Sequence, residues 1–223
     1  VELGASSGGD YLNDPKHLLF SLSRYKFVSK MLTGFDDVLE IGCGDGFGTA
    51  LVSAVVKRLT AVDLDSRQIE QNIESSPFIN KIDFITHDIL QGPVDGEYDA
   101  VYCLDVFEHI EKKYEIQLIK TIISSLKSDG VCIIGMPSFE SQAYASRLSK
   151  LGYVNCKTGN ELKSLMEKFS HRVFIFPMND EVLHTGYHPM SHYVFSLCIA
   201  PFETFKSTRS KFFTIHIVTH YFR

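Results

Sequence analysis

Hydrophobic positions between residues 35 and 138 alternate between two spacings, which predicts strands and helices in alternation. Short apolar runs indicate strands, and apolar residues three or four positions apart indicate helices. The predicted strands are 37–41, 59–64, 81–86, 98–104 and 131–136, and the predicted helices are 48–57, 66–75 and 114–126. This alternation predicts a parallel sheet with helices on both faces.

The residues before this region predict one helix. Residues 1–13 contain GASSGGD and are expected to be loosely ordered. Asp14-Pro15 is a favourable helix start, because Asp caps the first turn and proline fits the first helical position. Leu18, Leu22 and Tyr25 then recur at helical spacing.

The alternation stops at residue 138. Residues 138–160 are rich in Ser, Tyr, Gly and Asn and are predicted to be an inserted cover over one end of the sheet. A helix near 160–169, a strand at 172–176, a polar loop at 177–192 and a final strand at 193–200 are predicted to follow. Residues 203–223 contain KFFTIHIVTHYFR, which has strand character and no assigned function.

Composition narrows the class of protein. The chain has 223 residues, 44% hydrophobic and 22% charged, which suits one globular domain with a full core. Its net charge is -5 and no basic run exceeds two residues, so neither nucleic acid nor a membrane surface is an expected partner. The five cysteines include no C-x-x-C pair, which favours buried free thiols. No signal peptide or long apolar stretch is found, so a cytoplasmic location is expected.

The most informative stretch is VLEIGCGDGFG at residues 38–48. A glycine-rich turn after a strand is typical of a nucleotide-like ligand. The dinucleotide pattern G-x-G-x-x-G fails in both frames, because its third glycine falls on Phe47 or on Thr49. The phosphate-loop pattern also fails, because no Lys-Ser or Lys-Thr follows the glycines. A diphosphate is therefore not the expected ligand.

The pattern E-x-G-x-G-x-G at residues 40–46 resembles motif I of the class I S-adenosylmethionine (SAM)-dependent methyltransferases. Three more segments support the resemblance in the proper order. Asp63 ends the second predicted strand and Asp88 follows the third, in THDI. Residues 98–110, YDAVYCLDVFEHI, resemble the fourth-strand motif of the ubiquinone-biosynthesis branch, and residues 126–134, LKSDGVCII, resemble the segment before the fifth strand.

The resemblance implies a fold, a cofactor and a domain layout. The implied fold is a Rossmann-like α/β domain with a seven-stranded, mostly parallel sheet and a final antiparallel strand. Within the single domain 1–223, residues 1–34 would form a lid helix and 35–138 the SAM-binding core. Residues 139–160 and 177–192 would cover the substrate side, and 203–223 stay an unassigned tail.

The resemblance also implies which residues bind SAM and its product S-adenosylhomocysteine (SAH). Asp63 would accept hydrogen bonds from the ribose hydroxyls, since a carboxylate accepts two at once, and Asp88 would face the adenine. Arg24, on the first helix, pairs with the carboxylate of SAM or is simply a surface arginine. The full implied set is Glu40, Gly42, Cys43, Gly44, Gly46, Asp63, Leu64, Asp88, Ile89, Leu104 and Arg24.

Candidate catalytic residues follow the fourth predicted strand, where ligands of such sheets bind. Asp105, Glu108 and His109 are spaced to share one helical turn. Methyl transfer from a sulfonium mainly needs positioning and exclusion of water, whereas a hydroxyl acceptor also gains from a base or a metal. Three hypotheses stay open: His109 is a general base, the three residues with a later histidine hold a divalent metal, or the segment is a structural helix cap.

The loop HTGYHPMSHY at 184–193 supplies the candidate substrate contacts, unless it is simply a solvated loop. The candidates are His184, Tyr187, His188, His192 and, in the inserted cover, Tyr153. The expected function is SAM-dependent methyl transfer to a hydroxyl, or an amine, of a small polar molecule. Residues 17–30 and 177–193 resemble bacterial methyltransferases of surface polysaccharides or sugar nucleotides, which implies a sugar or phosphorylated acceptor.

Two other functions remain as alternatives. One is a SAM-binding sensor or partner protein without turnover, against which the Asp105-Glu108-His109 segment argues. The other is a NAD-dependent Rossmann oxidoreductase, against which the glycine spacing argues. We expect a monomer or a homodimer.

Overall fold

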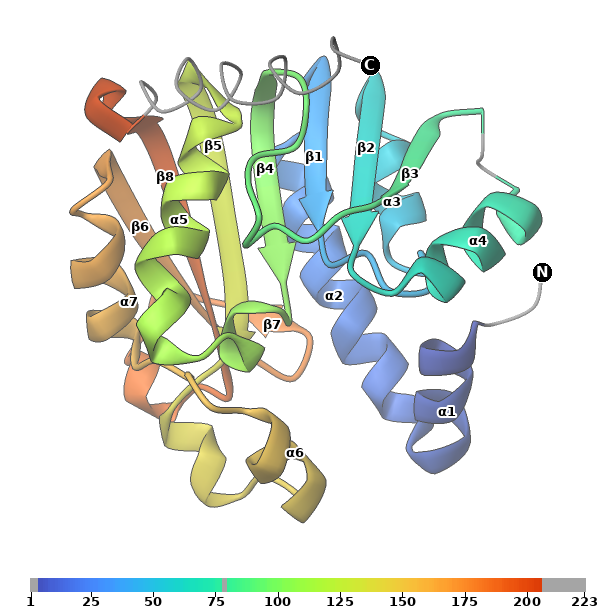
Figure 1. The fold of residues 1–223 in the computed structure, drawn as a ribbon. Coiled ribbons are helices and arrows are strands. Elements are labelled where there is room, and N and C mark those ends of the chain that lie inside the picture. Colours follow the sequence, from blue (N-terminus) through green and yellow to red (C-terminus); the bar gives the residue numbers. More distant parts are fainter. Residues whose placement is uncertain (1–3, 78–79, 206–223) are drawn as a thin grey trace, which may run out of the picture.

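The computed structural model describes residues 4–77 and 80–205, whose strands form one mixed sheet (Figure 1). The strand order is β3-β2-β1-β4-β5-β8-β6-β7. Strands β1 to β5 pair in parallel, and β8 runs antiparallel to β5 and β6. The strands are β1 Asp37–Ile41, β2 Arg58–Asp63, β3 Ile82–Thr86, β4 Tyr98–Leu104, β5 Leu126–Pro137, β6 Ser170–Asn179, β7 Val182–Leu183 and β8 Tyr193–Pro201.

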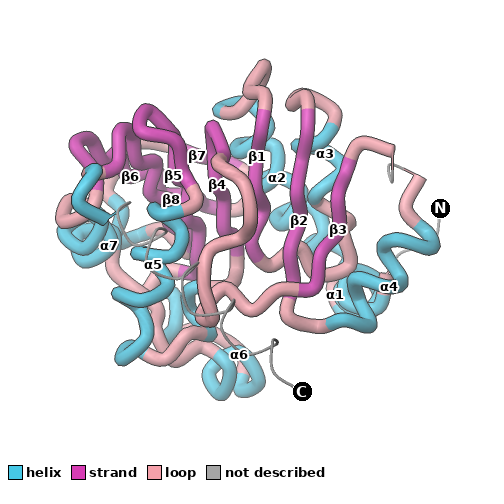
Figure 2. Tube along the Cα trace, turned by 45° about the horizontal axis from the view of Figure 1, so that its top comes forward, coloured by secondary structure: helices cyan, strands magenta, loops and turns pink. Residues whose placement is uncertain are grey.

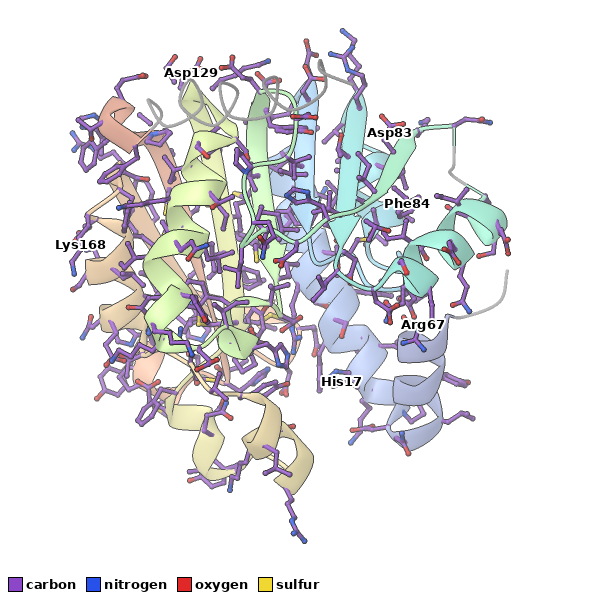
Figure 3. All side chains as sticks on the ribbon, in the orientation of Figure 1. His17, Arg67, Asp83, Phe84, Asp129 and Lys168 are labelled. Atoms are coloured by element: carbon purple, nitrogen blue, oxygen red, sulfur yellow. The ribbon has the colours of Figure 1, made fainter. Side chains whose placement is uncertain are left out.

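Helices cover both faces of the sheet (Figures 1 and 2). Buried side chains of α5 and α7 pack on one face, and those of α2, α3 and α4 pack on the other. The helices are α1 Ala5–Asn13, α2 Pro15–Met31, α3 Thr49–Ser53, α4 Ser66–Ser75, α5 Glu115–Ser124, α6 Arg147–Gly152 and α7 Gly159–Met166. Successive side chains along a strand point to opposite faces of the sheet. On β3, Phe84 is buried and its neighbour Asp83 is exposed (both are labelled in Figure 3).

This architecture confirms the predicted fold class, but the predicted strand number was wrong. The described residues form eight strands rather than seven. The extra strand β7 lies inside the predicted loop 177–192 and pairs with Met178 and Asn179 of β6. Asp180 allows the tight reversal, because it adopts φ +49°, a left-handed conformation that Asp tolerates better than most residues. The segment KFFTIHIVTHYFR, with its predicted strand character, is 211–223 and lies outside the described residues.

The N-terminal residues differ from expectation. Residues 5–13, expected to be loosely ordered, form α1. Ser7 fastens this helix to the turn after β1, because its backbone N–H and its hydroxyl donate to the two carboxylate oxygens of Asp45 at 2.7 and 2.9 Å. The tertiary contact outweighs the poor helix propensity of the two glycines in ASSGGDYLN.

The carboxyl ends of β1 to β5 share one edge of the sheet, which is the lower edge in Figure 1. The turn after β1, the residues after β4, and α1 and α6 all lie at this edge (Figure 1). All five cysteines are free thiols, four of them buried. Among the described residues, no helix combines the length and the apolar character needed to cross a membrane.

Candidate active site

The turn after β1 has the backbone shape that its glycines predict. Gly42, Gly44 and Gly46 adopt φ values of +80°, +53° and +71°, which other residues rarely adopt. A side chain at Gly42 would also overlap the side chain of Val106, which follows β4. The turn therefore lies directly against the segment that carries the candidate catalytic residues.

Asp63, at the end of β2, holds this turn in place. Its Oδ2 accepts a hydrogen bond from the Gly44 N–H, and its Oδ1 accepts one from the Asp65 N–H, both at 2.9 Å. A carboxylate offers about four acceptor positions, so two remain for a ligand. The next residue, Leu64, is 71% exposed, which leaves an apolar side chain available beside those acceptor positions.

Asp88 follows β3 at the same edge. Its Oδ1 accepts a hydrogen bond from the Leu90 N–H at 2.9 Å, and its Oδ2 accepts one from the Gln91 side-chain amide at 3.2 Å. Ile89 is buried in the core. The structure thus brings Asp63 and Asp88 to adjacent strand ends, as the sequence predicts.

Glu40 lies buried on β1 beneath the turn. The Tyr25 hydroxyl of α2 donates to Glu40 Oε1 at 2.9 Å, and Tyr102 of β4 is its neighbour in register. Burial raises the pKa of Glu40 to about 7. The Tyr25 ring also packs against Gly48 so closely that any side chain there would overlap it. These contacts fasten α2 to the base of the turn.

Arg24 is placed differently from expectation. Its guanidinium is buried, and Nη1 forms an ion pair with Asp105 Oδ2 at 2.7 Å. The same guanidinium lies over the Tyr193 ring, 4.1 Å from its centroid. Asp105 adopts φ +55°, an uncommon conformation for a residue other than glycine. Arg24 is therefore a buried arginine with a protein partner, not a surface arginine.

The structure separates the two neighbours Glu108 and His109, which both belong to the short 3₁₀ helix Phe107–His109. Glu108 is fully buried, and burial together with Asp105 raises its pKa well above the usual range. His109 is exposed, its Nδ1 lies 3.1 Å from the Gly152 carbonyl, and its ring contacts Tyr153 edge-on. Glu108 therefore faces inward, whereas His109 lies at the surface.

The three loop histidines do not converge on Asp105, Glu108 and His109. His184 Nε2 lies 3.5 Å from Asn179 Oδ1, and His188 Nε2 lies 3.2 Å from Asn160 Oδ1. His192 packs near Phe20 of α2, and burial lowers its pKa. Tyr187 is 71% exposed. Within residues 4–77 and 80–205, no three or more His, Cys, Asp or Glu side chains form a group able to hold a metal ion.

Sequence reasoning missed the residue that fastens the inserted cover. Lys157 is buried, and its Nζ donates to Glu115 Oε2 at 2.7 Å and to Asn155 Oδ1 at 2.6 Å. The N–H groups of Val154 and Asn155 both donate to the carbonyl oxygen of Glu108, at 2.8 and 3.0 Å. An isolated lysine in a polar segment gives no signal of burial, so only the fold reveals this contact.

Comparisons with known proteins match part of this chain to methyltransferases. A family model described as a methyltransferase domain matches residues 38–130. Nodulation protein S from Azorhizobium caulinodans is 35% identical over 104 residues, which cover 45% of this chain and 49% of that protein. A ubiquinone biosynthesis O-methyltransferase from Rickettsia felis is 28% identical over 137 residues, which cover 59% of this chain and 52% of that protein.

A solved structure shows the same fold. The crystal structure of N-methyltransferase NodS from Bradyrhizobium japonicum WM9, in complex with SAH, matches with a TM-score of 0.62 and 17% identity. The match covers 82% of this chain and 86% of that one. The chain spans about half the length of the curated relatives it matches.

Proposed function

We propose that the protein transfers a methyl group from SAM to a hydroxyl or an amine of a small molecule, because residues 38–130 match a methyltransferase domain model and the chain shares the fold of a solved methyltransferase. The single observation that carries the proposal is the left-handed glycine turn at Gly42–Gly46, fastened by Asp63. A turn of this shape lets backbone come close to a ligand, and the adjacent carboxylate supplies acceptors for two hydroxyls.

The cofactor proposal assigns the remaining residues of this edge. Asp63 accepts the ribose hydroxyls, Leu64 covers the adenine, and Asp88 faces its amino group. Backbone at Gly42, Cys43 and Leu104 contacts the amino-acid end of SAM. Since Arg24 already pairs with Asp105, the proposal leaves out a salt bridge between Arg24 and the carboxylate of SAM.

The acceptor lies on the other side of the sulfonium, next to the segment after β4. Residues 4–34 form the lid there, and 139–160 with 177–192 form the cover, including His184, Tyr187, His188, His192 and Tyr153. Relatives that match this chain carry the names N-methyltransferase and O-methyltransferase, so both acceptor atoms stay in the proposal. A sugar or phosphorylated acceptor and a cytoplasmic location are likewise proposals that rest on the sequence.

Calorimetric titration tests the cofactor first. We expect SAH to bind the wild-type protein and NADH not to bind; the reverse result would support the oxidoreductase alternative. A screen with radiolabelled methyl-SAM over phenols, amines, sugar nucleotides and phosphorylated metabolites then tests turnover. Tight SAH binding with no transfer to any acceptor would favour the non-catalytic SAM-binding alternative.

A further inference from the structure

Glu108 is a buried carboxyl group that the described residues leave unsatisfied. Its side chain is fully buried, and neither carboxylate oxygen has a hydrogen-bond partner among the residues that the structure describes. Buried polar groups are nearly always hydrogen-bonded, and a buried carboxylate without a partner costs several kcal/mol. Such an unsatisfied group beside a proposed ligand site indicates a role that a ligand completes.

The side chains that face Glu108 come from several elements and supply no net charge to balance its carboxylate. Asp105 and Arg24 act on it electrostatically, and Glu108 in turn acts on Tyr193 of β8, on Cys103 of β4, and on Tyr153 and Cys156 of the cover. Asp105 neutralises Arg24 through their ion pair. With Glu108 ionised, the cluster of Arg24, Asp105 and Glu108 therefore carries one negative charge.

The cluster of Arg24, Asp105 and Glu108 reaches both solvent and the cofactor turn. The cluster is not sealed from solvent, because the Asp105 side chain is 35% exposed. It also adjoins the cofactor turn, since Val106 contacts Gly42. A group bound at Asp105 and Glu108 would thus lie beside the end of the turn where the proposed methyl donor is held.

We infer that this cluster binds the acceptor as a primary or secondary amine in its ammonium form, and that Glu108 is its principal anionic partner. An ammonium group supplies the one positive charge that the cluster lacks and several N–H donors for the unpaired Glu108 oxygens. A neutral hydroxyl supplies one donor and no charge. This inference rests on the proposed function, and within it selects nitrogen over oxygen as the methyl acceptor.

The reaction then follows with every proton accounted for. The ammonium N–H bond breaks and its proton passes to a Glu108 carboxylate oxygen, which leaves a neutral amine and a carboxylic acid. The nitrogen lone pair forms the new N–CH₃ bond while the S–CH₃ bond of SAM breaks and its electrons stay on sulfur, giving SAH. The methylated product leaves as an ammonium ion, and Glu108 releases its proton to water before the next turnover.

The test uses matched acceptor pairs and matched variants. Benzylamine, hexylamine and glucosamine are each compared with benzyl alcohol, hexanol and glucose as acceptors of radiolabelled methyl from SAM. The variants are Glu108→Gln and, as a control on the same segment, Glu111→Gln, whose exposed side chain pairs with Lys113 at the surface. Binding of each amine to the SAH-loaded protein is measured by calorimetry in parallel.

We expect transfer to the amines and not to the alcohols. Glu108→Gln should lower kcat/KM at pH 7 about 100-fold, the usual lower range for loss of an acid-base group. Its rate should then rise about tenfold per pH unit up to the amine pKa, because only free amine from solution can react. Glu111→Gln should match the wild type, and all three proteins should bind SAH equally.

Several outcomes would overturn the inference. Transfer to the alcohols alone, or an equal loss in the two variants, would exclude the role of Glu108 in amine binding. The inference also fails if no amine is methylated and none binds the SAH-loaded wild-type protein more tightly than the Glu108→Gln protein. Failure of SAH itself to bind would instead overturn the proposed function.

Discussion

Asp63→Asn tests the proposed cofactor site most directly. In the structure each Asp63 oxygen accepts one backbone N–H, from Gly44 and from Asp65, and two acceptor positions remain. Asparagine has one oxygen, so it loses one backbone contact and the charge that strengthens bonds to the ribose hydroxyls. A hydrogen bond to a charged group contributes about 1.5–3 kcal/mol, which corresponds to about 10- to 150-fold weaker SAH binding.

Calorimetric titration with SAH measures this loss, and thermal unfolding without ligand separates binding from folding. Asp83→Asn is the matched control, because Asp83 is exposed on the neighbouring strand β3 (Figure 3). We expect the control to bind SAH like the wild type. If Asp63→Asn binds SAH within twofold of the wild type while remaining folded, the assignment of Asp63 to the ribose is wrong.

Three further predictions concern stability and catalysis. Burial raises the pKa of Glu40 to about 7 from 4.5, so its contribution to the free energy of unfolding is fully present below about pH 4.5 and falls by about 3 kcal/mol as the pH rises through about 7. Glu40→Gln should remove this fall in urea unfolding. The prediction is wrong if the free energies of unfolding of the variant and the wild type change with pH in parallel. Lys157→Met breaks a buried ion pair and should lower the free energy of unfolding by about 3 kcal/mol. The expected result is a Tm lower by about 6–12 °C. Lys163→Met, which breaks an exposed ion pair, is the control and should change Tm little. His109→Ala removes an exposed side chain and should lower kcat less than Glu108→Gln; the opposite order in single-turnover assays would favour His109 as the general base.

The sequence predicted most of the fold because its signals are local. Apolar runs and helical spacing placed β1 to β4 within one residue of their observed bounds, although β5 begins at Leu126, before the predicted 131, and the glycine pattern placed the turn after β1. The signals failed where long-range contacts decide the structure. Helix α1 forms although its sequence contains two glycines, because Ser7 binds Asp45. Strand β7 forms inside a predicted loop, because β6 extends to Asn179 and offers it a partner.

The candidate site also has a part that the sequence could identify and a part that only the structure shows. Gly42, Gly44, Gly46 and Asp63 could be identified from sequence, since a left-handed turn demands glycine and a carboxylate at a strand end has few structural reasons to be there. The sequence also identified the segment after β4, but it could not rank Glu108 against His109. Their different environments depend on what packs over them.

The sequence by itself therefore determined the strands β1 to β4, the position of the turn and the class of methyl donor proposed for it, because these depend on residue types at fixed spacings. Only the tertiary structure decided that Arg24 pairs with Asp105, and that Lys157 fastens the cover. It also decided that Glu108 faces inward with no hydrogen-bond partner in the described part of the chain, while His109 faces solvent. Burial and charge pairing arise between residues far apart in the chain, and they set the pKa values and the unmet hydrogen bonds from which the acceptor is inferred.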